Sequence, residues 1–129
     1  MTNLEIIKST YEGKTSEDIW KNLPKYLAAN VRWKAAEGFP YAGIYIGFQS
    51  IHKNVFSRLA NEWEDYKLTV EDCMYSDDRV IAYGTYSGIY KATGKFFEAR
   101  FVHLWKLRNG KIVSFEQIVD SKPVNDCLS

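Results

Sequence analysis

Two polar side chains interrupt an otherwise apolar pattern near the end of the chain. Residues 96–108 and 111–120 each alternate aromatic or β-branched residues with polar ones, and an Asn-Gly turn signal separates them, which predicts a β-hairpin. His103 and Gln117 fall among the apolar positions of this hairpin. A few polar groups within an apolar, aromatic surface are typical of a ligand pocket. We therefore expect a small-molecule site on one face of the hairpin.

The chemistry open to His103 is acid or base catalysis, because an imidazole titrates near neutral pH. Desolvated among aromatic rings, it could move a proton next to a carbonyl while Tyr11 or Tyr86 donates to the enolate oxygen. Glu37 is the carboxylate that could serve as the base. Gln117 does not titrate, so its role is hydrogen bonding. The alternative is a pocket histidine whose ring nitrogens are satisfied by neighbouring polar groups or water.

Three functions are compatible with such a pocket. The first is an isomerase- or cyclase-type enzyme that transfers a proton without a metal or cofactor. The second is a non-catalytic module that binds an apolar ligand carrying a carbonyl or hydroxyl. The third is a dimeric scaffold whose pocket is filled by its own aromatic side chains. The residues expected to line the pocket are Trp33, Trp63, Tyr86, Phe101, Phe115 and Gln117.

The turn of the hairpin decides which residues share a face with His103. A two-residue turn pairs His103 with Glu116. A three-residue loop with Gly110 in the left-handed region, followed by a bulge, shifts the pairing by one residue. That register places His103 on one face with Trp105 and Phe115, and we favour it because it gathers the apolar side chains.

Helical periodicity is confined to the first half of the chain. Residues 3–12 suit a short amphipathic helix. Thr15 or Ser16 can cap a second helix whose inner stripe ends at Leu27, with a kink or a split into two short helices at Pro24.

The central segment is expected to hold a strand, a loop and a third helix. Residues 31–37 alternate as a strand. Residues 38–43 form a glycine- and aromatic-rich loop, either a lid over a cavity or a packed surface loop. The third helix should begin at Ser50, with its apolar stripe ending at Trp63.

Two further strands are expected over residues 66–75 and 80–91. Gly84 and Gly88 lie two positions either side of Tyr86 in the second of these strands. Glycines inside a strand usually mark a bend or a close approach, so this part of the sheet should be concave.

Helices first and a meander of strands afterwards predict an α+β fold, in which about three N-terminal helices pack on the concave face of a curved, antiparallel or mixed sheet. At 129 residues the chain is too short for two domains. We expect residues 1–120 to form one domain and residues 121–129, which lack periodicity, to form a C-terminal tail.

The overall composition argues against several classes of partner. The formal net charge is +1 and no basic block occurs, so nucleic acid is not expected. No leader-like start or membrane-spanning stretch is apparent, which favours a cytoplasmic protein. Cys73, Cys127 and His52 match no metal-site spacing, so we expect no metal and two reduced cysteines.

This order of elements and several local motifs resemble the SnoaL-like family of the nuclear transport factor 2-like superfamily, kin to polyketide cyclases and ketosteroid isomerases. The resemblance covers nearly the whole chain and implies a cone-like fold. Its motifs are specific for the fold rather than for an activity. The segments that carry it are 31–33, 40–47, 92–95, 101–105, 109–112 and 117–120.

The resemblance also implies roles for single residues. His103 stands where ketosteroid isomerases have an acidic group that hydrogen-bonds the oxyanion, and Tyr11 stands near their oxyanion tyrosine. Ala35 stands where those enzymes keep the carboxylate that shuttles the proton. Compared with limonene-epoxide hydrolases, Gln117 replaces a catalytic aspartate, and Gly84 and Tyr86 replace the other two triad residues.

A protein partner is also expected. The convex face of the sheet should carry Val102, Leu104 and Ile118 among charged residues. Sheet faces of this fold commonly pair in its relatives, so the resemblance implies a homodimer through the convex face.

Overall fold

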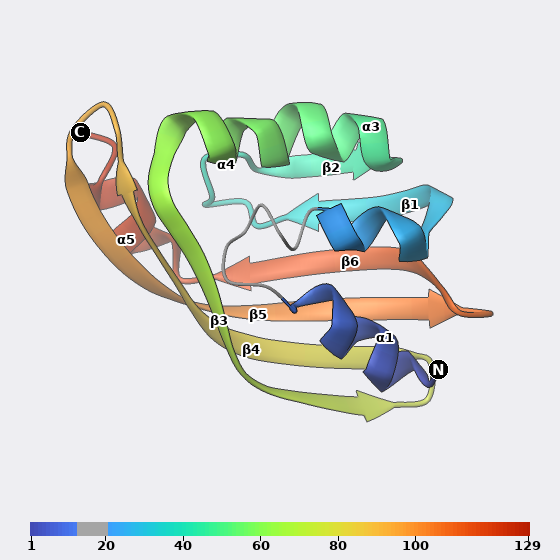
Figure 1. The fold of residues 1–129 in the computed structure, drawn as a ribbon. Helices are drawn as coiled ribbons and strands as arrows, with labels where there is room; N and C mark the ends of the chain where they lie inside the picture. Colours follow the sequence, from blue (N-terminus) through green and yellow to red (C-terminus); the bar gives the residue numbers. More distant parts are fainter. Residues whose placement is uncertain (13–20) are drawn as a thin grey trace.

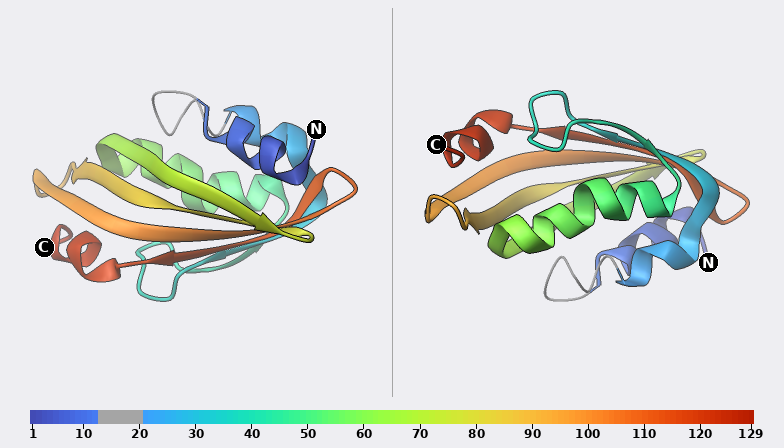
Figure 2. Two further views of the ribbon diagram at one scale, coloured as in Figure 1. Left: turned by 90° about the horizontal axis from the view of Figure 1, so that it is seen from below. Right: turned by 90° about the horizontal axis from the view of Figure 1, so that it is seen from above.

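A single curved sheet of six strands organises the described part of the chain, in the order β2-β1-β6-β5-β4-β3. The computed structural model describes residues 1–12 and 21–129. The helices α1, α3 and α4 lie on one side of the sheet, and α5 lies at one end of it (Figures 1 and 2). The expected α+β fold is confirmed, with fewer helices than predicted in the described part of the chain. The strands are β1 Leu27–Ala35, β2 Gly43–Ile46, β3 Trp63–Ser76, β4 Arg79–Tyr90, β5 Lys95–Arg108 and β6 Lys111–Val119.

The first helix, α1 (Asn3–Thr10), begins with a capping box. The Thr2 hydroxyl accepts from the Glu5 backbone N–H, and the Glu5 carboxylate accepts from the Thr2 N–H, both at 3.1 Å. These bonds satisfy two amides that the helix itself leaves unpaired.

The second helix was expected to kink or split at Pro24, and the prediction that Leu27 lies on its inner stripe is wrong. Leu23–Tyr26 form a short 3-10 helix, η1, and Leu27 is the first residue of β1. Pro24 explains this, because it fits the first turn of a helix but cannot donate a hydrogen bond inside one. The predicted caps, Thr15 and Ser16, lie outside the described residues.

The third helical segment starts earlier than expected and contains a π-helical stretch. It consists of α3 (Phe48–Ile51), η2 (His52–Phe56) and α4 (Ser57–Glu62), which follow one another without a break in Figure 1. It begins after Gly47, whose φ is 81°, rather than at Ser50. Its buried side chains follow the predicted stripe, but Trp63 already belongs to β3.

The strands pair antiparallel except for β1 and β6, which run parallel. Gly84 lies opposite a bulge of β3 between Val70 and Asp72. A Cβ atom at Gly84 would lie 1.9 Å from the carbonyl oxygen of Thr69, so this position requires glycine. The glycine therefore marks a close approach of two strands, as the sequence predicted.

The β5–β6 hairpin has the predicted pairing but not the predicted turn. His103 pairs with Gln117 and Trp105 with Phe115, as in the favoured register. The turn, however, has only two residues, and both have positive φ, 51° and 76°, as a type I′ turn requires. The one-residue shift in the pairing of β5 with β6 occurs beyond the turn, at a bulge around Val113 of β6.

Two parts of the chain differ from the sequence-based expectation. Residues 43–46, which begin at the last residue of the expected loop and were otherwise assigned to no element, form the short edge strand β2. The segment expected as a tail forms α5 (Ser121–Asp126), in which Val124 is fully buried and is followed by the buried Cys127. Because α5 packs apolar side chains against the sheet, burial orders this segment even though six residues are too few to show a helical period.

Candidate functional site

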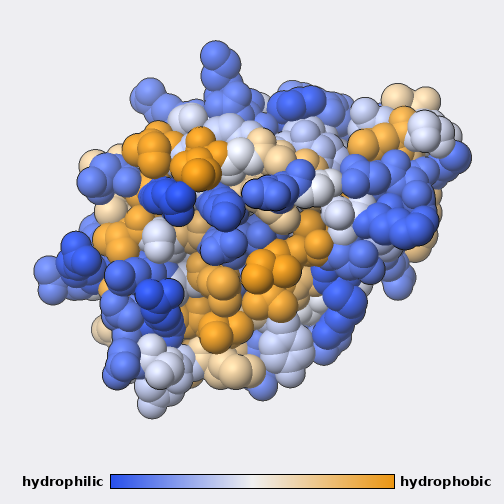
Figure 3. Space-filling view, turned by 180° about the vertical axis from the view of Figure 1, so that it is seen from behind, coloured by the Kyte–Doolittle hydropathy of each residue, from blue (hydrophilic) through white to orange (hydrophobic). Residues whose placement is uncertain are grey.

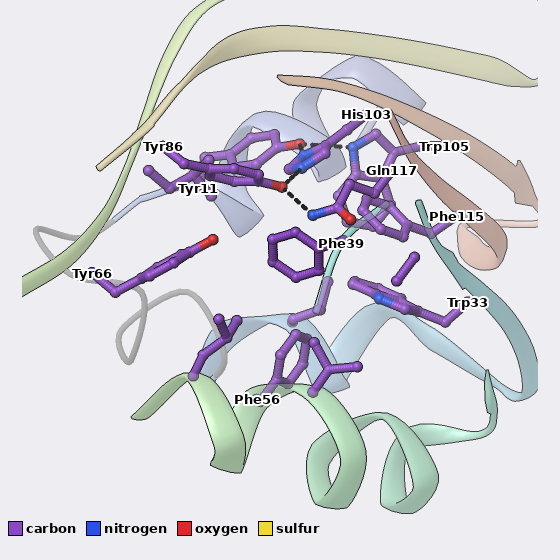
Figure 4. A pocket seen from close by; sticks show the side chains of 15 residues that line it. Tyr11, Trp33, Phe39, Phe56, Tyr66, Tyr86, His103, Trp105, Phe115 and Gln117 are labelled. Atoms are coloured by element: carbon purple, nitrogen blue, oxygen red, sulfur yellow. Dashed lines mark hydrogen bonds between the residues drawn. The ribbon is translucent and has the colours of Figure 1, made fainter. Parts of the chain in front are cut away.

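A cavity of about 70 Å³ lies between the concave face of the sheet and the helical segment η2–α4 (Figure 4). Every strand except the edge strand β2 contributes to its wall, together with Tyr11 directly after α1, with η1 and with the loop between β1 and β2. Its lining residues are Tyr11, Leu23, Trp33, Ala35, Phe39, Val55, Phe56, Leu59, Tyr66, Leu68, Tyr86, His103, Trp105, Phe115 and Gln117.

Aromatic rings form one end of the cavity because the strand register brings them into a row. Trp33, Phe115 and Trp105 are directly paired across β1, β6 and β5. The rings of Trp33 and Phe115 stack with centroids 3.8 Å apart, and Trp105 contacts Phe115 at 4.6 Å. Rigid, closely packed rings of this kind provide apolar contact area for a ligand.

The polar end of the cavity is a continuous chain of hydrogen bonds centred on His103. The Tyr11 hydroxyl lies 2.7 Å from its Nδ1, and the Tyr86 hydroxyl lies 2.5 Å from its Nε2. The Trp105 indole N–H donates to the Tyr11 oxygen at 2.8 Å. The Gln117 side-chain amide donates to the Tyr86 oxygen at 3.0 Å. Both ring nitrogens of His103 therefore have a phenol as partner.

A backbone contact fixes the orientation of the Gln117 amide. The Ala36 backbone N–H, which can only donate, lies 3.2 Å from the Gln117 Oε1. The amide NH₂ must then face Tyr86. Ala36 immediately follows the last residue of β1, so the parallel pairing of β1 with β6 brings this donor to Gln117.

Burial keeps the groups of this chain uncharged. His103 is only 4 % exposed, and burial lowers its pKa to about 3. Burial likewise raises the pKa of Tyr86 and, against a hydrogen bond from Trp105, that of Tyr11. At neutral pH the cavity thus presents a neutral imidazole and three neutral phenols, because burial also raises the pKa of Tyr66, which lines the cavity. No aspartate, glutamate, lysine or arginine lines it among the described residues.

The structure brings together some of the residues predicted from the sequence and separates others. Tyr11, His103 and Gln117 meet in one chain, and Trp33, Tyr86 and Phe115 also line the cavity. Three predicted residues do not line it. Trp63 donates instead to Tyr41, Phe101 is buried beneath Tyr86 and His103, and Glu37 is exposed in the turn after β1.

Most of the lining residues that the sequence analysis did not name come from the helices and the loop. Val55 and Leu59 lie on the predicted apolar stripe of the third helix, so that stripe was the available signal. Phe39 lies in the loop considered as a lid, and it is buried at 4 % exposure. Only the packing of this loop over the sheet shows that its aromatic side chain reaches the cavity.

The described residues hold neither a metal-binding group nor a membrane-crossing helix. No cluster of three or more His, Cys, Asp or Glu side chains that could hold a metal occurs in residues 1–12 and 21–129. Cys73 and Cys127 are both free thiols. Within the same ranges, no helix is long and apolar enough to cross a membrane.

Comparisons with solved structures give close matches over nearly the whole chain. An NTF2-like protein from Burkholderia thailandensis E264 is 35% identical with a TM-score of 0.94, and the match covers 100% of this chain and 98% of that one. TerC, co-crystallised with polyporic acid, is 24% identical with a TM-score of 0.82 and coverage of 97% and 96%.

A third match is a protein with a ketosteroid isomerase-like fold from Catenulispora acidiphila, in complex with trimethylamine. It is 18% identical with a TM-score of 0.78, and the match covers 98% of this chain and 93% of that one. The comparison with curated proteins found no match. The model of the SnoaL-like domain matches residues 9–115. With most of its length matched by that model, this chain belongs to the SnoaL-like domain family.

Proposed function

We propose that the protein binds a small, neutral, mostly apolar molecule whose carbonyl or hydroxyl oxygen accepts a hydrogen bond at the polar end of the cavity. The observation that carries this proposal is the Tyr11–His103–Tyr86 chain at one end of an otherwise apolar, aromatic cavity. Apolar walls supply binding energy, and a few placed polar groups supply orientation. An ionised ligand would lose its hydration without gaining a partner of opposite charge among the described lining residues.

The size of the cavity limits the ligand. At about 70 Å³ it is well below the ~300–1,000 Å³ of common ligand pockets. A ligand with a single ring, or one that displaces a lining side chain, fits this site better than a polycyclic one. Two proteins of the same fold were crystallised with polyporic acid and with trimethylamine, which supports small-molecule binding as the role of the cavity.

Proton abstraction next to a carbonyl is the second candidate, and the Tyr–His–Tyr chain favours it. Two phenols joined through an imidazole can stabilise a developing enolate and pass a proton. A base is the component missing among the described lining residues, since Glu37 is exposed outside the cavity and both nitrogens of His103 already contact phenols. Binding without turnover is therefore the function that the geometry supports best.

Titration with benzaldehyde tests the proposed binding. We expect saturable NMR shifts of the indole N–H signals of Trp33 and Trp105, which line the cavity, and none for Trp63, which does not. Replacing Ala35 by Leu fills the cavity and should weaken binding by about 10-fold. The matched enlargement Val102→Leu, on the outer face of the sheet, should leave affinity unchanged. Shifts confined to surface residues would refute a cavity site.

A further inference from the structure

The side-chain chemistry of the hydrogen-bond chain around His103 fixes how many donor protons it contains. Trp105 and Gln117 can only donate to their tyrosine partners, so each phenol oxygen already accepts one hydrogen bond. Each phenol also contacts one nitrogen of the imidazole. A neutral imidazole carries one proton, so one of its nitrogens must donate and the other must accept.

This count leaves one phenol proton without a partner. The phenol that faces the bare nitrogen uses its proton in that contact. The phenol that faces the N–H accepts instead, and its own proton has no partner among the described residues. Which phenol this is depends on the tautomer: Tyr11 keeps the spare proton when Nδ1 is protonated, and Tyr86 keeps it when Nε2 is protonated.

We propose that Tyr11, His103 and Tyr86 form a tautomeric relay that holds a single uncommitted phenol proton and offers it from either tyrosine to the acceptor oxygen of a bound neutral carbonyl compound. The inference rests on the proposed function and adds the ligand class. One donor matches one carbonyl oxygen, while a carboxylate would bring a charge that one phenol cannot compensate in an apolar cavity.

Three ligands that share a benzene ring separate the effects of apolar contact, of one hydrogen bond and of charge on binding. Toluene probes the apolar wall, benzaldehyde adds one neutral acceptor, and benzoate adds a charge. We expect benzaldehyde to bind about 3- to 10-fold more tightly than toluene, the range for one hydrogen bond, and benzoate to bind more weakly than toluene. Equal binding of benzaldehyde and toluene would contradict the donor role of the relay.

Single and double phenylalanine variants test whether both tyrosines can donate. Tyr11→Phe and Tyr86→Phe should each keep a preference for benzaldehyde over toluene, because the remaining phenol can still be the one that donates. On a Tyr66→Phe background, which removes the other phenol that lines the cavity, the double variant Tyr11→Phe/Tyr86→Phe should lose the preference. Loss of the preference in only one single variant would mean a single fixed donor and would overturn the relay.

The tautomer of His103 is the readout that a purely structural role would not change. With benzaldehyde bound, ¹⁵N NMR of the imidazole should show Nε2 protonated in Tyr11→Phe and Nδ1 protonated in Tyr86→Phe. The same tautomer in both variants, or a doubly protonated ring, would overturn the relay while leaving the proposed binding function intact. Failure of the wild-type protein to bind benzaldehyde at all would refute both the relay and the proposed binding function.

Discussion

A histidine in this cavity has two phenols as its hydrogen-bond partners and no carboxylate beside it among the described lining residues. A carboxylate partner would favour the imidazolium form, whereas burial among aromatic rings favours the neutral form. The aromatic ring contacts of Phe101 and Phe115 with His103, at 4.3 and 4.9 Å, leave little room for hydrating water. The neutral state of His103 is therefore a property of its packing.

The neutral state makes the stability of the fold depend on pH. The pKa of an ordinary histidine is about 6.5, and in the folded chain that of His103 is lowered to about 3. Between these values the unfolded chain binds a proton that the folded chain does not. The free energy of unfolding should therefore fall as the pH is lowered through this window, by at most about 1.4 kcal/mol per pH unit. The stabilisation is fully present above pH 6.5.

Urea unfolding between pH 7 and pH 5 measures this slope. His103→Gln removes the titrating group and should flatten the slope relative to the wild type, whatever its effect on absolute stability. Val102→Leu on the outer face changes no titratable group and is the control, so it should keep the wild-type slope. Equal slopes for the wild type and His103→Gln would show that His103 titrates normally.

At the residue level, the sequence identified the polar end of the site better than its walls. His103 and Gln117 stand out because they are polar at apolar positions of a strand, and strand pairing brings them together. Tyr11 was identifiable only by its position on a helical stripe and by the resemblance. The distinction between Trp33, which lines the cavity, and Trp63, which does not, depends on tertiary packing that no local pattern encodes.

At the scale of elements, alternation and turn signals located β3 to β6, but non-local contacts were not predictable. The parallel pairing of β1 with β6 joins segments about 80 residues apart, as the register of Trp33 with Phe115 shows. The edge strand β2 has only four residues, all at least partly exposed, so it has no apolar period. The helix α5 is likewise too short for periodicity and depends on burial.

Hydrogen bonds to other elements hold the loop between β1 and β2 in place. No pattern in the sequence predicts these contacts. The Tyr41 hydroxyl donates to Glu62 of α4 at 2.7 Å and accepts from the Trp63 indole at 2.9 Å. The Asn125 amide of α5 donates to the Gly38 carbonyl at 2.8 Å. These contacts hold the loop so that its Phe39 side chain forms part of the cavity wall.

Phe39 should accordingly set the upper size limit of the ligand. Replacing it by Leu shortens the wall and should improve binding of 1-naphthaldehyde relative to benzaldehyde by several-fold, at a stability cost of about 1 kcal/mol. Isothermal titration with the two aldehydes measures the ratio. Phe101→Leu is the matched control, because Phe101 is equally buried but does not line the cavity. An unchanged ratio in Phe39→Leu would assign the size limit to other lining residues.

At the scale of the whole molecule, the convex face of the sheet carries apolar side chains among charged ones (Figure 3). The strand register aligns directly paired residues, one from each strand, in a row across this face. The apolar members Ile44 and Met74 at its two ends are 50% and 46% exposed, and Ile118 beside the row is 49% exposed. The row consists of Ile44, Lys34, Glu116, Leu104, Ile81 and Met74.

We propose that two copies of the chain pair through this face. Acidic and basic side chains both occur on it, including Lys34 and Glu116, which lie 3.7 Å apart. A two-fold pairing presents the same patch from both copies, so a face with both charges and apolar strips can be complementary to itself.

A charge placed on this face tests the pairing. Because two-fold symmetry introduces each substitution twice, Ile118→Lys should weaken the dimer by at least about 10-fold, which sedimentation velocity across a concentration series would detect. Tyr75→Lys is the control, since Tyr75 is 67% exposed but pairs with Val80 on the opposite face. A wild-type chain that stays monomeric at its solubility limit would contradict the proposal. The exposed isoleucines would then be isolated apolar residues of the kind that most protein surfaces carry.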